Sequence, residues 1–402
     1  MFVNPLAPSN PYNPFNSHVP IKQSLPHDKD IKPKPPGDNI PRYLNFLADY
    51  TGCGHWRMLW PEQVLNSYRQ CVIQSSTVMI TDLKHFNDVE CIRVQRQASP
   101  AQQKYLEFLR SNTNARLIYE IDDICFSEDI PDYNPFKSAF TSPETRASIQ
   151  YMMEFCDEMT VTCPAMREYF LDKTKQTNIT VIPNYPTRSW LGRFYDRKRI
   201  SSIYDKSIKK PRILYAGSSS HFDIHRKNDN KDDMSHVIDG VLSTINKYQW
   251  VFLGGYPAAL ENLVQQGKVE FHKWAHLCDY PDIVYNLKIN AMIAPLADNI
   301  FNRCKSNIKF LEASGLGIPI ICQDIGTYDI CPNKFTTNTQ MLDEINKLFN
   351  NKKYYMNICE SNYNKLCNLW LENIDNRTKY LELYKYSYGS PERVNINNIN
   401  DN

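Results

Sequence analysis

The sequence predicts an α/β protein with two doubly wound domains, each a parallel sheet covered by helices, that face a cleft. Short runs rich in β-branched and aromatic residues alternate with helical runs, a pattern typical of β-α-β units. The alternation occurs twice, before and after a basic stretch at 188–211, and 402 residues are enough for two such domains. Ligands of these folds bind beyond the carboxyl ends of the strands, so we expect functional residues in the loops that follow strands.

The first 41 residues differ in composition from the rest of the chain. They contain ten of the 25 prolines. Because proline fixes φ and lacks an N–H donor, residues 1–41 are expected to form an extended arm rather than a domain.

The first domain is expected over 42–187. Ser99-Pro100 and Ser142-Pro143 suit the cap and first turn of two of its helices. The expected strands are 42–50, 76–81, 91–94, 116–121, 158–162 and 179–182. The expected helices are 56–70, 99–112, 142–155 and 164–173.

The second domain is expected over 212–350, after the basic interdomain linker 188–211. Its expected strands are 212–216, 250–253, 269–272, 290–294 and 318–322. Its expected helices are 234–246, 280–287, 305–316 and 341–349, and the helical pattern continues over 352–371. Residues 351–402 are expected to form C-terminal helices, for which a return to the first domain is one arrangement.

Composition excludes several classes of protein. The formal net charge is +2, from 46 Lys and Arg against 44 Asp and Glu, which excludes a wholly basic nucleic-acid coat but not a local basic face. No apolar run approaches the ~18 residues of a membrane span, and the N-terminus lacks a signal-peptide pattern. The 12 cysteines form no Cys-x-x-Cys pair, so we expect reduced thiols, a cytoplasmic location and no metal site.

The strongest candidate site lies in Leu296–Ile321, where a strand is followed by the start of a helix. A helix N-terminus offers free N–H groups to an anion, and Ser306 stands at this one. Lys305 and Lys309 add positive charge one turn apart, and Glu312 follows on the same face. The group suits a nucleoside diphosphate, with the helix start and the lysines at the diphosphate and the carboxylate at ribose hydroxyls. The alternative is an ordinary amphipathic helix with solvated lysines.

Two further loops follow strands. Gly54 and Arg57 lie after the first strand, where a glycine turn lets the backbone approach a ligand and Arg57 could reach a phosphate. His55 is a candidate catalytic residue there, and a simple tight turn is the alternative. Gly217 and Ser218 occupy the equivalent place in the second domain.

Asp122 and Asp123 end the strand 116–121. A carboxylate at this end of a strand could accept the proton of an acceptor hydroxyl. The alternative is a helix cap or a solvated loop. No metal role is expected for the pair.

Cationic residues form a fourth candidate set, because basic residues interleaved with aromatic ones suit contacts to phosphates and bases. In a two-domain fold the linker is expected to border the cleft, which favours such contacts. A solvated linker is the alternative. The set consists of Arg93, Arg96, Trp190, Arg197, Lys198 and Arg199.

The stretch Glu312–Ile320, with a glutamate, small residues and Gly-x-Pro before a short strand, resembles the donor-site signature of GT-B glycosyltransferases, and of family 4 in particular. The approach to the linker, Cys156–Pro164 followed by Ile182-Pro183-Asn184, is similar too. The sequence departs from family 4 in two respects. Lys305 stands seven residues before Glu312, where that family commonly has a second glutamate, and the segment 217–223 lacks the family's usual Arg and Lys-Gly pair. The resemblance covers roughly residues 50–330.

The resemblance implies a hydroxyl-directed glycosyltransferase with a UDP-sugar as co-substrate and no other cofactor. The first domain would then hold the acceptor and the second the donor. Gly-Cys-Gly-His-Trp-Arg at 52–57 and Tyr-Glu-Ile-Asp-Asp at 119–123 resemble segments of bacteriophage-encoded enzymes, which implies double-stranded DNA with hydroxymethylated bases as the acceptor, in the host cytoplasm. The alternatives are an envelope glycan or protein acceptor, and a catalytically silent GT-B protein that binds nucleic acid or glycan.

Overall fold

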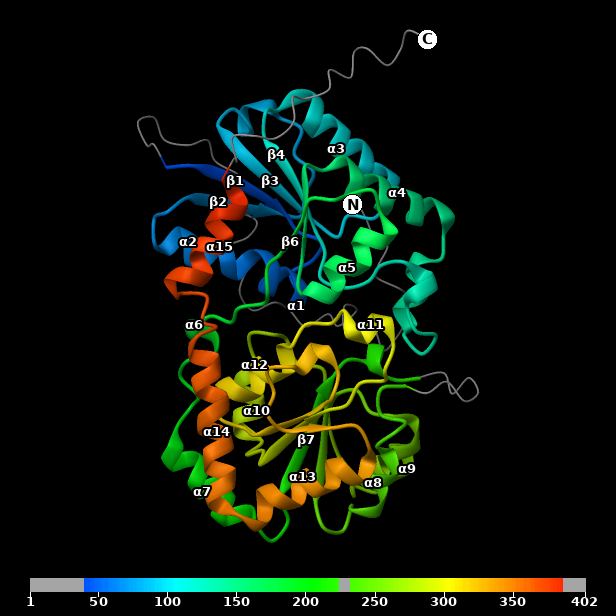
Figure 1. The fold of residues 1–402 in the computed structure, drawn as a ribbon, viewed down its shortest axis with the longest axis vertical. Coiled ribbons are helices and arrows are strands. Elements are labelled where there is room, and N and C mark those ends of the chain that lie inside the picture. Colours follow the sequence, from blue (N-terminus) through cyan, green and yellow to red (C-terminus); the bar gives the residue numbers. More distant parts are fainter. Residues whose placement is uncertain (1–39, 224–231, 386–402) are drawn as a thin grey trace.

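The computed structural model describes residues 40–223 and 232–385, so almost all of the expected N-terminal arm lies outside the described residues. Each half of the described chain is built on one six-stranded sheet, and every strand pair is parallel. Figure 1 shows the two halves one above the other, with helices covering the sheets. The expected pair of doubly wound α/β domains is confirmed.

The N-terminal sheet has the order β2-β1-β3-β4-β5-β6. The order changes direction at β1, so the loops after β1 and β3 diverge and leave a crevice at the carboxyl ends. The strands are β1 (Arg42–Phe46), β2 (Val72–Ser76), β3 (Val89–Gln95), β4 (Arg116–Glu120), β5 (Glu158–Val161) and β6 (Ile179–Val181). The helices are α1 (Gly52–Gly54), a π-helical segment (His55–Leu59), α2 (Trp60–Ser67), α3 (Pro100–Asn112), α4 (Pro143–Phe155) and α5 (Pro164–Lys173).

The C-terminal sheet has the order β12-β11-β10-β7-β8-β9, with its switch point between β7 and β10. The strands are β7 (Arg212–Gly217), β8 (Gln249–Gly254), β9 (Glu270–Lys273), β10 (Ala291–Ala294), β11 (Ile320–Gln323) and β12 (Lys334–Phe335). The helices that follow β7 are α8 (Ile238–Ser243), α9 (Glu261–Gln265), α10 (Tyr280–Asn286), α11 (Ile300–Arg303), α12 (Ile308–Gly315), α13 (Asn338–Asn350) and α14 (Lys352–Cys367).

Two element boundaries differ from expectation in ways that affect the site. The first strand ends at Phe46, and the glycine turn is the start of a helical segment: a Cβ on Gly54 would lie 1.9 Å from the carbonyl oxygen of Asp49, so glycine is required by the chain's own packing. The helix expected over 305–316 begins only at Ile308, with Asn307 as N-cap. Lys305 therefore lies in the loop before α12 rather than on the helix.

The basic stretch after β6 is helical and packed. It forms α6 (Arg188–Leu191) and α7 (Arg197–Ser207), and α7 contacts α14. Figure 1 places α7 beside the lower half of α14, away from the junction of the two halves. Ile200 and Tyr204 are buried beneath its polar face. This amphipathic pattern explains why a run of cations folds as a helix instead of an open linker.

The chain returns to the N-terminal half at its end. Helix α15 (Ile374–Tyr384) packs on α2, and Tyr384 stacks on Tyr43 of β1 with 4.7 Å between ring centroids. The apolar core is continuous across the junction, where Trp56 and Trp60 pack around Trp190. No helix within the described ranges is long and apolar enough to cross a membrane.

Candidate functional site

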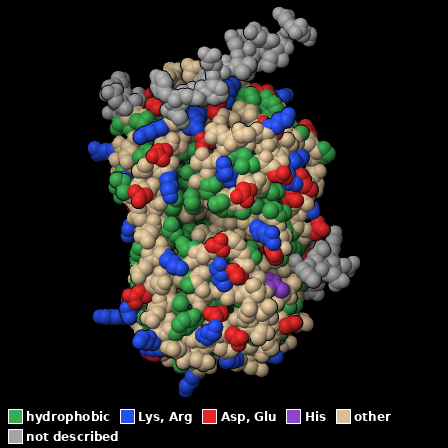
Figure 2. Space-filling view, in the orientation of Figure 1, with side chains coloured by type: hydrophobic (Ala, Val, Ile, Leu, Met, Phe, Trp, Pro, Cys, Tyr) green, Lys and Arg blue, Asp and Glu red, His purple; other side chains and the backbone are tan. Residues whose placement is uncertain are grey.

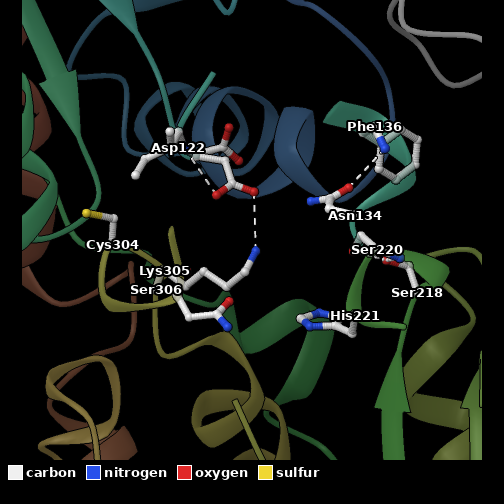
Figure 3. Close-up of polar contacts among 12 residues, drawn as sticks. Asp122, Asn134, Phe136, Ser218, Ser220, His221, Cys304, Lys305 and Ser306 are labelled. Carbon is white, nitrogen blue, oxygen red and sulfur yellow. Dashed lines mark hydrogen bonds and ion pairs between the residues drawn. The ribbon is translucent and has the colours of Figure 1, made fainter. Parts of the chain in front are cut away.

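The carboxyl ends of the two sheets meet at the junction of the halves, and charged side chains from both lie in contact there. The ammonium of Lys305, in the loop after α11, lies 3.3 Å from a carboxylate oxygen of Asp123, in the loop after β4. Figure 3 shows Lys305 reaching from one half toward the carboxylates at Asp122, with Ser306 beside it and His221 on a neighbouring loop. The structure thus brings together two of the sequence-predicted sites.

The loop before α12 is held by the opposite domain. Asn184, three residues after the end of β6, donates a 2.9 Å hydrogen bond from its side-chain nitrogen to the hydroxyl of Ser306. The N-cap side chain of Asn307 makes no capping bond, and the helix begins with Ile308 and Lys309. The first N–H groups of α12 and two lysines therefore converge at the domain junction, an arrangement that suits an anion.

Lys309 and Glu312 lie on α12, and both have shifted pKa values. Burial lowers the pKa of Lys309 to about 8, with Lys305 acting in the same direction and Asp233 and Glu312 opposing it. Burial raises the pKa of Glu312 to about 7, and the neighbouring Lys309 and Tyr280 oppose that rise. Neighbouring groups with shifted pKa values in a crevice are candidates for a functional site.

The loop after β7 lies beside this helix. A Cβ on Gly254, which has φ +97°, would lie 2.6 Å from the carbonyl oxygen of Gly217, so the ends of β7 and β8 approach too closely for any side chain. The hydroxyls of Ser218 and Ser220 are 2.6 Å apart. The contact between this loop and α12 is made by His221, whose Nε2 lies 3.4 Å from the ammonium of Lys309. Among the described residues, the hydroxyl of Ser218 contacts only its own loop, through Ser220.

The N-terminal half contributes a charged cluster from three strand ends. Arg96, after β3, lies 2.7 Å from the carboxylate of Asp49 and 3.5 Å from that of Asp122. Arg96 also has φ +45°, a strained backbone for a residue other than glycine and a frequent feature of functional sites. Asp123 is the more exposed of the two carboxylates, at 35% of its side chain against 12% for Asp122. Burial raises the pKa of Asp123, and Lys305 opposes that rise.

Arg57 and Arg93 were expected to contact ligands, and the structure places both inside the N-terminal half. Both are 0% exposed and pair with the buried carboxylate of Glu120, at 2.5 Å in the case of Arg57. Arg57 also donates to the carbonyl of Ile182 at 2.6 Å. Their role is to fix β4 against the chain leaving β6, a partnership that the sequence pattern could not reveal because Glu120 lies 63 residues from Arg57.

His55 is 4% exposed and its Nδ1 contacts the carbonyl of Thr51 at 2.8 Å. Burial lowers its pKa. Its Nε2 lies 4.0 Å from the sulfur of Cys278 in the other half. These contacts describe a packed residue of the helical turn, which was the alternative weighed for this site.

The cationic set does not form one surface. Trp190 is 8% exposed and donates its indole N–H to the carbonyl of Leu277 at 2.9 Å. Arg197 pairs with Glu360 at 2.6 Å on α14, and Arg199 lies 3.3 Å above the ring of Tyr285. The expectation that Arg197, Lys198 and Arg199 border the cleft is corrected by the position of α7. Because Arg197, Lys198 and Arg199 begin helix α7, they lie on the outer side of the C-terminal half.

Sequence reasoning missed a buried polar network at the same junction. His221, 8% exposed, lies 2.6 Å through Nδ1 from the carboxylate of Asp233, which also accepts from the hydroxyl of Tyr133 at 2.8 Å and from the amide of Asn302 at 2.6 Å. Tyr133 belongs to the N-terminal half and the other three to the C-terminal half. The available signal was the position of His221, four residues past the end of β7 at the switch point.

A histidine and a carboxylate together raise the question of a metal. The described part of the chain contains no group of three or more His, Cys, Asp or Glu side chains arranged to hold a metal ion.

Comparison with known proteins relies on the fold, because no protein-family model and no curated protein sequence matches the chain. The structure of HepE from Anabaena, in complex with UDP and glucose, superposes with a TM-score of 0.57 at 10% identity, covering 86% of this chain and 99% of HepE. The DNA-modifying β-glucosyltransferase of T4 phage gives a TM-score of 0.50 at 10% identity, covering 85% of this chain and 99% of that one. The chain has the GT-B fold.

A third GT-B structure, TarM, gives a TM-score of 0.50 at 12% identity and covers 74% of this chain. The chain spans about half of TarM's length, since only 55% of TarM is matched. At these identities the likeness confirms the expected architecture, while activity and substrates depend on the residues of the site.

Proposed function

We propose that this GT-B chain is a glycosyltransferase that transfers the sugar of a UDP-sugar to a hydroxyl group. The observation that carries the proposal is the convergence of Lys305, Lys309 and the N-terminus of α12 at the domain junction, opposite the carboxylates of Asp122 and Asp123. The C-terminal side of the junction can bind a diphosphate, and the carboxylates on the N-terminal side can accept a proton. Glycosyl transfer from a nucleoside diphosphate needs both.

The donor side stabilises the leaving group. As the bond between the sugar and the diphosphate breaks, negative charge grows on the phosphate oxygens. Fixed N–H groups and ammonium groups in a site closed to water stabilise such charge strongly. Glu312 lies one turn along α12 from Lys309, so its carboxylate is placed to accept hydrogen bonds from ribose hydroxyls when the lysines hold the phosphates.

The acceptor side takes up the proton. The acceptor oxygen forms the new bond to the sugar, and its proton passes to a carboxylate. Asp123 is the candidate for this role because it is the more exposed of the pair and lies next to Lys305. A bound diphosphate competes for Lys305 and leaves Asp123 with a less cationic neighbour, which makes the carboxylate a better base in the donor complex.

For the acceptor we propose double-stranded DNA with hydroxymethylated bases. The T4 phage β-glucosyltransferase, a DNA-modifying enzyme, shares the fold over 99% of its chain and supports this choice. Charged side chains of both signs are interspersed on the face of the molecule in Figure 2, so DNA contact would depend on a local surface rather than on a broad basic field.

The test is transfer from a panel of UDP-sugars to hydroxymethylated duplex DNA, read by mass spectrometry of the nucleosides, with unmodified duplex as control. We expect one UDP-sugar to give a glycosylated nucleoside. Asp123→Asn should lower turnover by about 10²–10⁴-fold, the range for general bases, without weakening UDP binding, because it removes the carboxylate that competes with the diphosphate for Lys305. Sugar transfer to a glycan acceptor but not to DNA would replace the DNA proposal. Failure to bind any nucleoside diphosphate would overturn the enzyme proposal itself.

A further inference from the structure

The buried network around His221 ends at a residue of the proposed donor site. Besides its contact with Asp233, the His221 ring lies 3.4 Å through Nε2 from the ammonium of Lys309. The order of contacts is therefore Tyr133, Asp233, His221, Lys309, and it runs from the N-terminal half to helix α12.

The partners fix the tautomer of His221. An ionised carboxylate only accepts hydrogen bonds, so Nδ1 of the ring carries the proton and donates it to Asp233. The lone pair of Nε2 then faces Lys309, whose ammonium only donates. Burial and the neighbouring lysines lower the pKa of His221 to about 4, so the ring is neutral at pH 7 and both contacts are satisfied.

Asp233 is itself held rigidly. Its Oδ1 accepts hydrogen bonds from the Tyr133 hydroxyl, from the Asn302 amide and, at 2.9 Å, from the backbone N–H of Ala297. Asp233 is 0% exposed. A carboxylate with this many donors cannot turn, and the imidazole bonded to its other oxygen is fixed with it.

We propose that His221 and Asp233 are positioning residues that hold the Lys309 ammonium in place for the donor diphosphate. This inference rests on the proposed function. Without the pair, the four-carbon side chain of Lys309 would have to be ordered by the ligand, at a cost in side-chain entropy. With it, the charge is in place before the donor arrives, and Tyr133 ties that placement to the opposite domain.

The first measurement uses UDP as the probe and calorimetry as the readout. In His221→Asn the shorter amide can still donate to Asp233 but does not reach Lys309, and we expect UDP binding to weaken about tenfold, as for the loss of one charge-assisted contact. In His221→Gln the side-chain oxygen takes the place of Nε2 and should restore most of the affinity. Thermal melting of each variant reports folding independently.

A double variant separates positioning from direct contact. If His221 acts through Lys309, then His221→Asn should cost nothing further in a Lys309→Ala background, because the group that it positions is absent. An undiminished loss in that background would mean that His221 touches the ligand itself and would overturn the proposal.

The pH profile gives a readout that a purely structural role would not move. The titratable groups that face Lys309 are Lys305, Asp233, Glu312, Cys322 and His221. Among them, the carboxylates of Asp233 and Glu312 raise the pKa of Lys309. Asp233→Asn removes one of those carboxylates, so UDP affinity should begin to fall at a lower pH than the wild-type value of about 8. An unchanged profile would overturn the inference even if the variants of His221 fail to fold.

The wild-type protein supplies the remaining control. If it binds UDP and the variants bind equally well at every pH, the inference fails while the proposed function stands. If it binds no UDP, the proposed function fails, and the inference fails with it.

Discussion

Each half of the molecule buries a cluster of charged residues, and the two clusters shift the pKa values of their members in opposite directions. In the first cluster the charged form of the carboxyl is favoured, and in the second the neutral forms are favoured. In the N-terminal half, Glu120 lies between Arg57 and Arg93, all three 0% exposed, and against the effect of burial the two guanidinium groups lower the pKa of Glu120. In the C-terminal half, the pKa of Lys309 is lowered and that of Glu312 is raised, so both shifts favour the neutral form.

The difference distinguishes a structural cluster from the proposed donor site. Glu120 has all the partners that it needs, so every member keeps its charge and the network holds strands together. On α12 the neighbouring groups only partly offset the effect of burial on Lys309 and Glu312. The remaining penalty is a cost in the free protein and, under the proposed function, a source of affinity once an anion and a sugar hydroxyl arrive. Substitutions should therefore affect stability in the first cluster and ligand binding in the second.

The largest expected effect is on stability. Glu120→Gln leaves two buried guanidinium groups without a carboxylate and should lower the free energy of unfolding by about 3–5 kcal/mol, measured by urea denaturation. The matched control is Glu128→Gln, which removes the partner of Arg146 in an exposed pair and should cost no more than about 1 kcal/mol. Equal effects of the two changes would contradict the comparison.

The next effect is on donor binding. Lys309→Ala and Glu312→Ala should each weaken UDP-sugar use by about 1–3 kcal/mol, the range for hydrogen bonds to charged groups, with little loss of stability. Lys347→Ala on α13, which removes an exposed lysine paired with Glu344, is the control and should bind UDP as the wild type does. If calorimetry finds unchanged affinity in both site variants, α12 is not part of the donor site.

A smaller effect should appear in the pH dependence of UDP affinity. Glu312 accepts ribose hydroxyls best when ionised, so affinity should rise as pH increases through about 7. Lys309 attracts phosphate only when protonated, so affinity should fall as pH passes about 8. Glu312→Gln should remove the acidic limb and move the alkaline limb to lower pH, because this carboxylate also raises the pKa of Lys309. Titration of the UDP phosphate lies lower, near pH 6.

The smallest effect concerns α7. Replacing Arg197, Lys198 and Arg199 together with alanine should leave the salt dependence of any DNA association unchanged, because this helix lies away from the junction and Arg197 is already paired with Glu360. A reduced salt slope in the triple variant would show that phosphates do contact α7.

The sequence predicted the parts of the fold that depend on local pattern. Alternating strands and helices predict two parallel sheets, and the glutamate-to-proline segment at 312–319 predicts α12 and its turn. Arg57 was misread because burial depends on partners distant in sequence. The cations at 197–199 were misread because composition does not say which way a helix faces. The pairing of His221 with Asp233 could not be predicted because, as for Arg57, the partner is distant in sequence, twelve positions away.

The return of the C-terminal segment has a mechanical consequence. The main chain passes between the halves twice, after β6 and again before α15, and the two passes are joined where the N–H of Leu371 donates to the carbonyl of Pro186 at 3.0 Å and that of Arg188 to the carboxylate of Glu372 at 2.7 Å. Two domains that are connected at two neighbouring points can still rotate relative to each other about the axis through those points. Figure 1 shows this double crossing on one side of the junction and α11 on the other. Opening of the junction would therefore be a hinge rotation. It would break the contacts of Lys305 with Asp123 and of Tyr133 with Asp233, which hold the closed arrangement.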